Sequence, residues 1–99
     1  MNLSNECDFL RTLEDVIDDR ILSKKQGSYT YSLYLGGVPL ITKKVGEEAV
    51  EVVVAAMAND KDWVIRETAD LIYHLLVLLR VMGLSMDDVC RELRNRHKG

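Results

Sequence analysis

Hydrophobic residues recur at three- and four-residue spacing along most of the chain, which is the pattern of amphipathic α-helices. In the first periodic segment, Phe9, Leu13, Val16 and Ile17 fall on one face of a helix. The pattern returns in later segments, which are separated by polar or glycine-containing stretches. The sequence therefore predicts five helices, over residues 5–22, 29–35, 39–58, 60 or 62 to 83, and 85–97.

Residues at the boundaries support these limits. Gly36-Gly37 ends the short second helix, and Pro39 suits the first turn of the third. Asn59-Asp60 breaks the third helix, and Ser85 with Asp88 resembles a capping box that opens the fifth. The run Val52-Val53-Val54 is prone to strand formation, but it lies inside a strong helical period. We predict an all-α helical bundle forming a single domain over residues 1–99.

The third and fourth predicted helices are apolar around most of their circumference in part of their length. A helix that is apolar on all sides must be covered on all sides. A chain of 99 residues buries only about 60–65% of its unfolded surface. We therefore expect a homo-oligomer, most simply a twofold homodimer with these two helices at its centre.

Composition narrows the classes of function. Sixteen acidic and thirteen basic residues give a formal net charge of −3, whereas nucleic-acid-binding domains are typically basic. The longest apolar stretch, residues 71–82, falls short of the roughly 20 residues that span a bilayer, and the N-terminus lacks a signal-peptide pattern. Cys7 and Cys90 fit no metal or redox motif and are interpreted as reduced thiols. We expect a soluble, cytoplasmic protein that binds neither membranes nor nucleic acid.

The acidic residues concentrate on two helical stripes. At 100° per residue, Glu48 and Glu51 share one face of the third helix, and Glu67 and Asp70 share one face of the fourth. The short connection makes these helices antiparallel neighbours, so the two acid pairs meet at similar height. Other residues on or beside the same stripes are Lys44, Glu47, Trp63 and His74.

Such a constellation favours a metal site. Carboxylates that converge between apolar helices cannot all stay ionised without a counterion, and oxygen-only ligand sets suit Mg²⁺ or Mn²⁺. These ions offset negative charge on phosphates and activate bound water, which indicates cleavage of a phosphate ester or anhydride. The alternative is that the acids are simply solvated.

The spacing also carries a family resemblance. Glu47-Glu48-x-x-Glu51, followed after fifteen residues by Glu67-x-x-Asp70, resembles the signature of the all-α NTP pyrophosphatase superfamily. Three further strings bring the chain closer to the phosphoribosyl-ATP pyrophosphohydrolase family, over residues 13–97. They are Gly27-Ser28-Tyr29-Thr30, Lys43-Lys44-Val45-Gly46-Glu47-Glu48-Ala49 and Ala69-Asp70-Leu71-Ile72-Tyr73-His74-Leu75-Leu76.

That resemblance implies hydrolysis of phosphoribosyl-ATP to phosphoribosyl-AMP and pyrophosphate, the second step of histidine biosynthesis. It also implies Mg²⁺ as cofactor, with Mn²⁺ as a possible substitute, and a dimer or larger assembly. Carried over by position, the implied metal ligands are Glu47, Glu48, Glu51, Glu67 and Asp70. All of them except Glu47 are also the expected catalytic residues.

Cationic and hydroxyl side chains nearby are candidates for substrate binding. Lys44 shares the face of the acids and is suited to hold the departing pyrophosphate as a point charge. The full set comprises Lys43, Lys44, Arg20, Lys24, Ser28 and Tyr29. His74 has two candidate roles, which are contact with a carboxylate or phosphate and a bond to a neighbouring helix. Trp63 is interpreted as a core or interface residue.

Two other functions remain open at this point. The same acid cluster would serve a general (d)NTP pyrophosphatase that cleanses nucleotide pools. The third candidate is a non-catalytic helical dimerisation module, in which the acidic residues only make the surface soluble.

Overall fold

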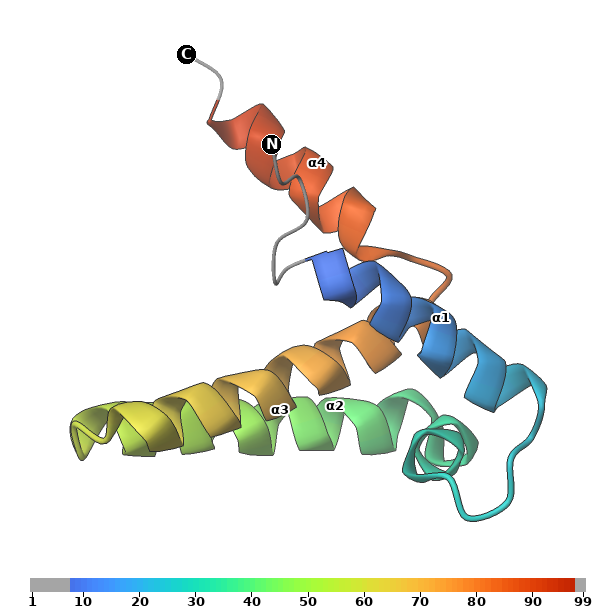
Figure 1. The fold of residues 1–99 in the computed structure, drawn as a ribbon, viewed down its shortest axis with the longest axis horizontal. Helices are drawn as coiled ribbons and strands as arrows, with labels where there is room; N and C mark the ends of the chain where they lie inside the picture. The colour runs from blue at the N-terminus through green and yellow to red at the C-terminus, as the bar shows by residue number, and fades with distance from the viewer. Residues whose placement is uncertain (1–7, 98–99) are drawn as a thin grey trace.

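The structure is a computed structural model that describes residues 8–97. Its helices are α1 (Phe9–Leu22), α2 (Tyr29–Met57), α3 (Lys61–Val81) and α4 (Met86–Arg96) (Figure 1). No strand occurs among the described residues, so the all-α prediction is confirmed. Residues 5–7 of the predicted helix 5–22, and with them the thiol of Cys7, lie outside the described range.

The long helix α2 contains a break where the sequence predicts two helices. Gly37 has φ 71° and ψ −172°, which is not helical and which side chains with a Cβ rarely adopt. A Cβ on Gly36 would overlap the side chain of Leu40. In Figure 1 the segment before the break is seen nearly end-on, whereas the rest of α2 runs across the view. The predicted short helix is therefore present, and Pro39 lies in the first turn after the break.

A tight turn folds α3 back along α2. Asn59 adopts φ 56°, a left-handed conformation that asparagine tolerates. Asp60 then caps α3, because its carboxylate accepts a hydrogen bond from the Trp63 N–H at 3.1 Å. The two helices lie side by side (Figure 1), which confirms the prediction of antiparallel neighbours.

The hydrophobic core sits at one end of the α2–α3 pair, where α1 crosses it. Five aliphatic side chains from these three helices are fully or almost fully buried there: Ile17, Leu33, Ile41, Leu76 and Val77. Burying a side chain of this size contributes about 1.5–3 kcal/mol. This cluster therefore holds the three helices together.

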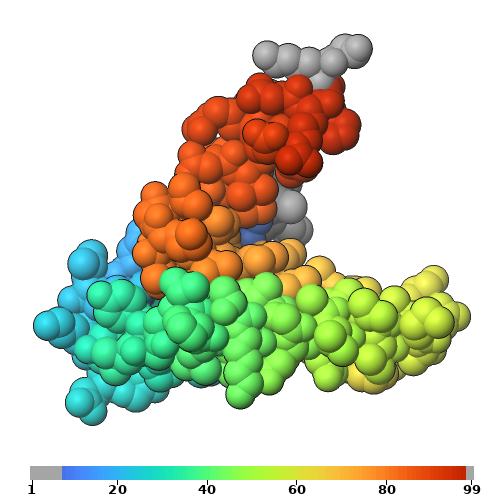
Figure 2. Space-filling view, turned by 180° about the vertical axis from the view of Figure 1, so that it is seen from behind, coloured from blue at the N-terminus to red at the C-terminus, as the bar shows by residue number. Residues whose placement is uncertain are grey.

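The other end of the pair, residues 50–65, extends beyond α1 and α4 as an arm (Figures 1 and 2). Its apolar side chains are open to solvent, with Val53 60% and Met57 83% exposed. Val50, Val54 and Ile65 are exposed as well. The chain alone thus leaves uncovered much of the apolar surface that the sequence pattern places on these helices.

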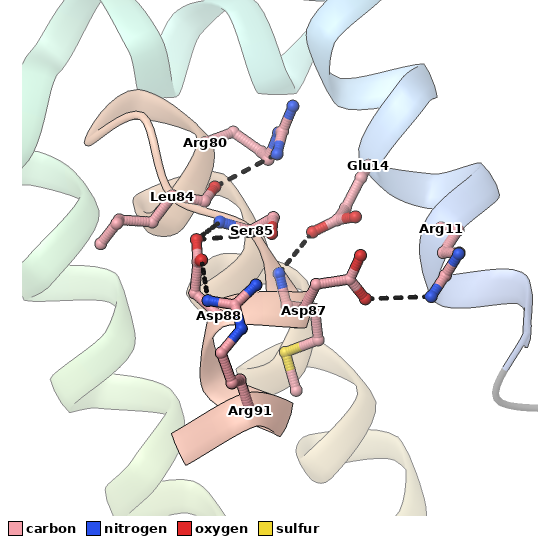
Figure 3. A network of polar contacts seen from close by, with 9 residues as sticks. Arg11, Glu14, Arg80, Leu84, Ser85, Asp87, Asp88 and Arg91 are labelled. Carbon is pink, nitrogen blue, oxygen red and sulfur yellow. Dashed lines mark hydrogen bonds and ion pairs between the residues drawn. The ribbon is translucent and has the colours of Figure 1, made fainter. Parts of the chain in front are cut away.

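Polar contacts attach the N-terminus of helix α4 (Figure 3), where Met86 also packs against the hydrophobic core. None of its residues is buried. Its first backbone N–H, on Met86, donates to the carboxylate of Glu14 in α1 at 2.8 Å. Asp88 accepts from the Ser85 N–H at 2.9 Å, so the predicted capping box is confirmed. Arg80 joins the same region by donating to Asp18 in α1 and to the carbonyl that precedes Ser85.

Two further features bear on the sequence predictions. Cys90 is an exposed free thiol, as expected. No single helix within residues 8–97 is both long and apolar enough to cross a membrane, and α3 and α4 reach that length and hydropathy only together, across a bend of 104°.

The contact of Glu14 with α4 predicts a stability effect. Glu14 is only 8% exposed, and replacing it with alanine leaves the Met86 N–H without its charged acceptor. We expect Glu14→Ala to lower the free energy of unfolding by about 1.5–3 kcal/mol, measured by urea denaturation. Asp15→Ala, at an exposed position on the same helix, is the matched control. Equal stability of the two variants would contradict this assignment.

Candidate active site

Three carboxylates from two helices converge on one face of the α2–α3 pair. Glu48 comes from α2, and Glu67 and Asp70 come from successive turns of α3. Each offers an oxygen, and these oxygens all lie within 4.8 Å of one another. The acid stripes that the sequence places on facing helices therefore meet, as predicted, through these three residues.

The other two acids of the predicted set lie outside this group. Glu47 is exposed, and its carboxylate lies 3.7 Å from the ammonium of Lys44, on the preceding turn. Glu51 is exposed one turn beyond Glu48, within the arm. Helical-wheel angles place Glu51 on the correct stripe, but Glu48 is the residue of α2 that reaches the α3 pair.

Burial and the neighbouring acids shift the pKa of Glu48. Its pKa is raised above the ordinary glutamate value, first by burial and then by hydrogen bonding to Glu67. The negative charges of Asp70 and Glu67 raise the pKa further, and His74 opposes them weakly. Glu48 therefore binds its proton more tightly than an isolated glutamate does, because burial and neighbouring negative charge both disfavour its ionised form.

Trp63 fixes the orientation of Glu67. Its indole N–H donates to Glu67 Oε2 at 3.1 Å from one turn earlier in α3. The sequence interpretation of Trp63 as core or interface missed this bond. The signal was available, because residues four apart on a helix face each other and both residues lie on the acid stripe.

His74 connects the acid cluster to the start of α2. It is buried, with Nδ1 2.7 Å from the main-chain oxygen of Asp70. Its Nε2 lies 2.7 Å from the hydroxyl of Tyr29. Of the two roles considered from the sequence, the bond to a neighbouring helix is therefore the one observed.

Of the candidate substrate-binding residues, Lys44 and Tyr29 have interactions that place them near this cluster. Lys44 is half-buried, and its charge acts on the Tyr29 hydroxyl, whereas Lys43 and Lys24 are exposed. Ser28 caps α2 by accepting the Tyr31 N–H at 3.2 Å. Arg20 lies half-buried in the last turn of α1. A hollow of about 470 Å³ opens beside the start of α2, lined by Gln26, Gly27, Ser28, Tyr29, Tyr31, Ser32 and Leu35.

Comparison with known proteins identifies the family. Residues 10–97 match the family model described as phosphoribosyl-ATP pyrophosphohydrolase. The chain belongs to the phosphoribosyl-ATP pyrophosphohydrolase family. The resemblance inferred from the acid signature is thereby confirmed, and the matched segment contains every predicted site residue, from Arg20 to Asp70. As a member of this family the chain is an enzyme, a hydrolase.

Curated relatives support the assignment over nearly the whole chain. The phosphoribosyl-ATP pyrophosphatase of Pyrobaculum islandicum is 57% identical over 90 residues, covering 91% of this chain and 96% of that protein. Its counterpart from Pyrobaculum neutrophilum is 58% identical with the same coverage. The histidine biosynthesis bifunctional protein HisIE of Vibrio cholerae is 51% identical over 90 residues, which cover 91% of this chain and 43% of that protein.

The raised pKa of Glu48 predicts a pH dependence for this family member. A carboxyl whose pKa is higher in the folded state binds its proton more tightly there, so stability falls as pH rises from the ordinary glutamate pKa through the raised one. We expect the free energy of unfolding, measured by urea denaturation in the presence of a chelator, to fall as the pH rises above the ordinary glutamate pKa.

The variant Glu48→Gln removes the titrating group. We expect it to flatten this part of the pH profile and to be more stable than the wild type at neutral pH. A profile for Glu48→Gln that is as steep as the wild-type profile would assign the pH dependence to another residue.

Proposed function

We propose that the chain hydrolyses phosphoribosyl-ATP to phosphoribosyl-AMP and pyrophosphate, the second step of histidine biosynthesis. The observation that carries this proposal is the convergence of Glu48, Glu67 and Asp70 in a chain that matches the family from residue 10 to residue 97. The names of the curated relatives agree with it. The free thiol of Cys90 fits action in the reducing cytoplasm.

We further propose that Mg²⁺, or Mn²⁺ in its place, is bound at this cluster. The donor set fits, because it consists of carboxylates alone, the ligands that hard cations prefer. Glu48, Glu67 and Asp70 would hold the ion, and Glu47 and Glu51 are near enough in sequence to complete its shell. When bound, such an ion offsets charge on the anhydride and lowers the pKa of a bound water.

The roles of this chain's own residues follow from their positions. Trp63 orients Glu67, and His74 holds Tyr29 beside the cluster. Lys44 supplies a half-buried positive charge on the same face, suited to the departing pyrophosphate. Lys43, Arg20, Lys24 and Ser28 are proposed to hold the rest of the polyanionic substrate.

A general (d)NTP pyrophosphatase would use the same cluster and is the alternative activity. The two are separated by measuring pyrophosphate release from phosphoribosyl-ATP and from a panel of dNTPs under identical conditions. We expect a clear preference for phosphoribosyl-ATP, and a preference for any dNTP would refute the proposed substrate. Membership of an enzyme family disfavours the third candidate, a non-catalytic dimerisation module.

Removing single carboxylates tests both the metal and the chemistry. We expect Glu48→Gln and Asp70→Asn each to lower kcat/KM by at least about 100-fold. Changing a residue that only supports a metal ligand already lowers metal affinity or activity by about 10–100-fold. Because Trp63 is the only tryptophan and donates to Glu67, its fluorescence should report Mg²⁺ binding in the wild type and lose that response in both variants.

Asp62→Asn is the matched control, since it makes the same change at an exposed position of α3. It should keep both activity and the fluorescence response. Full activity in Glu48→Gln and Asp70→Asn would refute the catalytic role of the cluster.

We also propose that the protein is a homodimer or larger homo-oligomer, formed through the exposed apolar side chains of the arm. Val53 and Met57 expose most of their apolar surface to water, and exposed apolar patches mark protein–protein interaction sites. We expect sedimentation to show an oligomer at micromolar concentration that Val53→Glu dissociates. Asn95→Glu, which adds the same charge to the exposed face of α4, should leave it intact. A monomeric wild type would refute this proposal.

A further inference from the structure

The start of α2 is fastened to α3 by two successive residues. The hydroxyl of Tyr29 pairs with Nε2 of His74 at 2.7 Å, and the buried hydroxyl of Thr30 bonds to the hydroxyl of Tyr73. The loop before α2 and the acid cluster of α3 are therefore joined at Tyr29. Tyr29 also lines the hollow beside that loop.

The bond of His74 to its own helix determines which ring nitrogen carries the proton. Nδ1 lies 2.7 Å from the main-chain oxygen of Asp70, and a carbonyl oxygen only accepts hydrogen bonds. Nδ1 therefore donates, and Nε2 of the neutral ring is left as an acceptor. The ring is 6% exposed and meets Tyr29 and Tyr73 edge to face, which prevents it from turning over.

This arrangement sets the hydrogen-bonding character of Tyr29. Because Nε2 accepts, the Tyr29 hydroxyl donates its single proton to His74. The remaining capacity of the hydroxyl oxygen is to accept, and Lys44, Glu48 and Asp70 are close enough to act electrostatically on it. A phosphate oxygen only accepts hydrogen bonds, so the Tyr29 hydroxyl has no donor left to offer it.

We propose that His74 is a positioning residue that presents the Tyr29 oxygen to an O–H donor at the acid cluster, either a sugar hydroxyl of the substrate or the attacking water. The proposal rests on the proposed function and alters one part of it. Tyr29 recognises a hydroxyl or water and does not bind the triphosphate directly.

Kinetics with substrate and with pyrophosphate as a product inhibitor test this assignment. Tyr29→Phe keeps the ring and removes the oxygen, so we expect kcat/KM for phosphoribosyl-ATP to fall by about tenfold, the effect of one hydrogen bond. The inhibition constant of pyrophosphate, which has no donor O–H when fully ionised, should stay unchanged. A rise in KM alone assigns the donor to a substrate hydroxyl, and a fall in kcat alone assigns it to the attacking water.

Variants of His74 test its part in the pair. His74→Gln retains a side-chain acceptor for the Tyr29 hydroxyl and should keep more activity than His74→Leu, which has none. The double variant Tyr29→Phe/His74→Leu should be no slower than the slower single variant, because both act on one interaction. Thermal unfolding of each variant verifies that it is folded. If His74→Leu does not fold, Tyr29→Phe still tests the proposal.

Weaker inhibition of Tyr29→Phe by pyrophosphate would overturn the inference, because it would mean that the tyrosine donates to phosphate. If the wild type hydrolyses phosphoribosyl-ATP and Tyr29→Phe has the same kcat/KM, this inference alone would be overturned. A wild type that releases no pyrophosphate from any nucleotide would overturn the proposed function and this inference together.

Discussion

The packing of α2 against α3 is the interaction on which the site depends. A shift of one residue between two helices moves each side chain by about 1.5 Å along the axis and 100° around it. Such a shift would separate Glu48 from Glu67 and Asp70. Repulsion among these acids opposes the packing, whereas the buried contacts of Ile41 and Leu76 favour it. The apolar core therefore holds the carboxylates in a proximity that they would not adopt alone.

The sequence predicts the helices well because their limits depend on local chemistry, as at Gly37 and Asp60. It predicts the site in part. Wheel angles identify the facing stripes, but they do not give side-chain rotamers or register within a turn, so the position of Glu51 outside the close group was not foreseen. The partner of His74 lies 45 residues away and depends on how α2 bends, which no local pattern encodes.

The fold distributes its apolar residues unevenly, and this bears on how the site is kept in place. The core cluster fixes the α1 end of the pair, while the arm carries exposed valines and Met57 at the other end. The acid cluster lies between these two regions. Its geometry is thus anchored on one side by contacts within the chain, and on the other side it adjoins apolar surface that the chain does not cover.

The break at Gly37 has a consequence for how the hollow and the carboxylates are placed relative to each other. It divides α2 into one piece that carries Tyr29 and another that carries Glu48. Both pieces contact α3, the first through the pairs Tyr29–His74 and Thr30–Tyr73 and the second through Glu48 at the acid cluster. The bend at this glycine therefore determines how the loop before α2 is aimed at the carboxylates, and helix α3 is the common support that holds the two pieces at that angle.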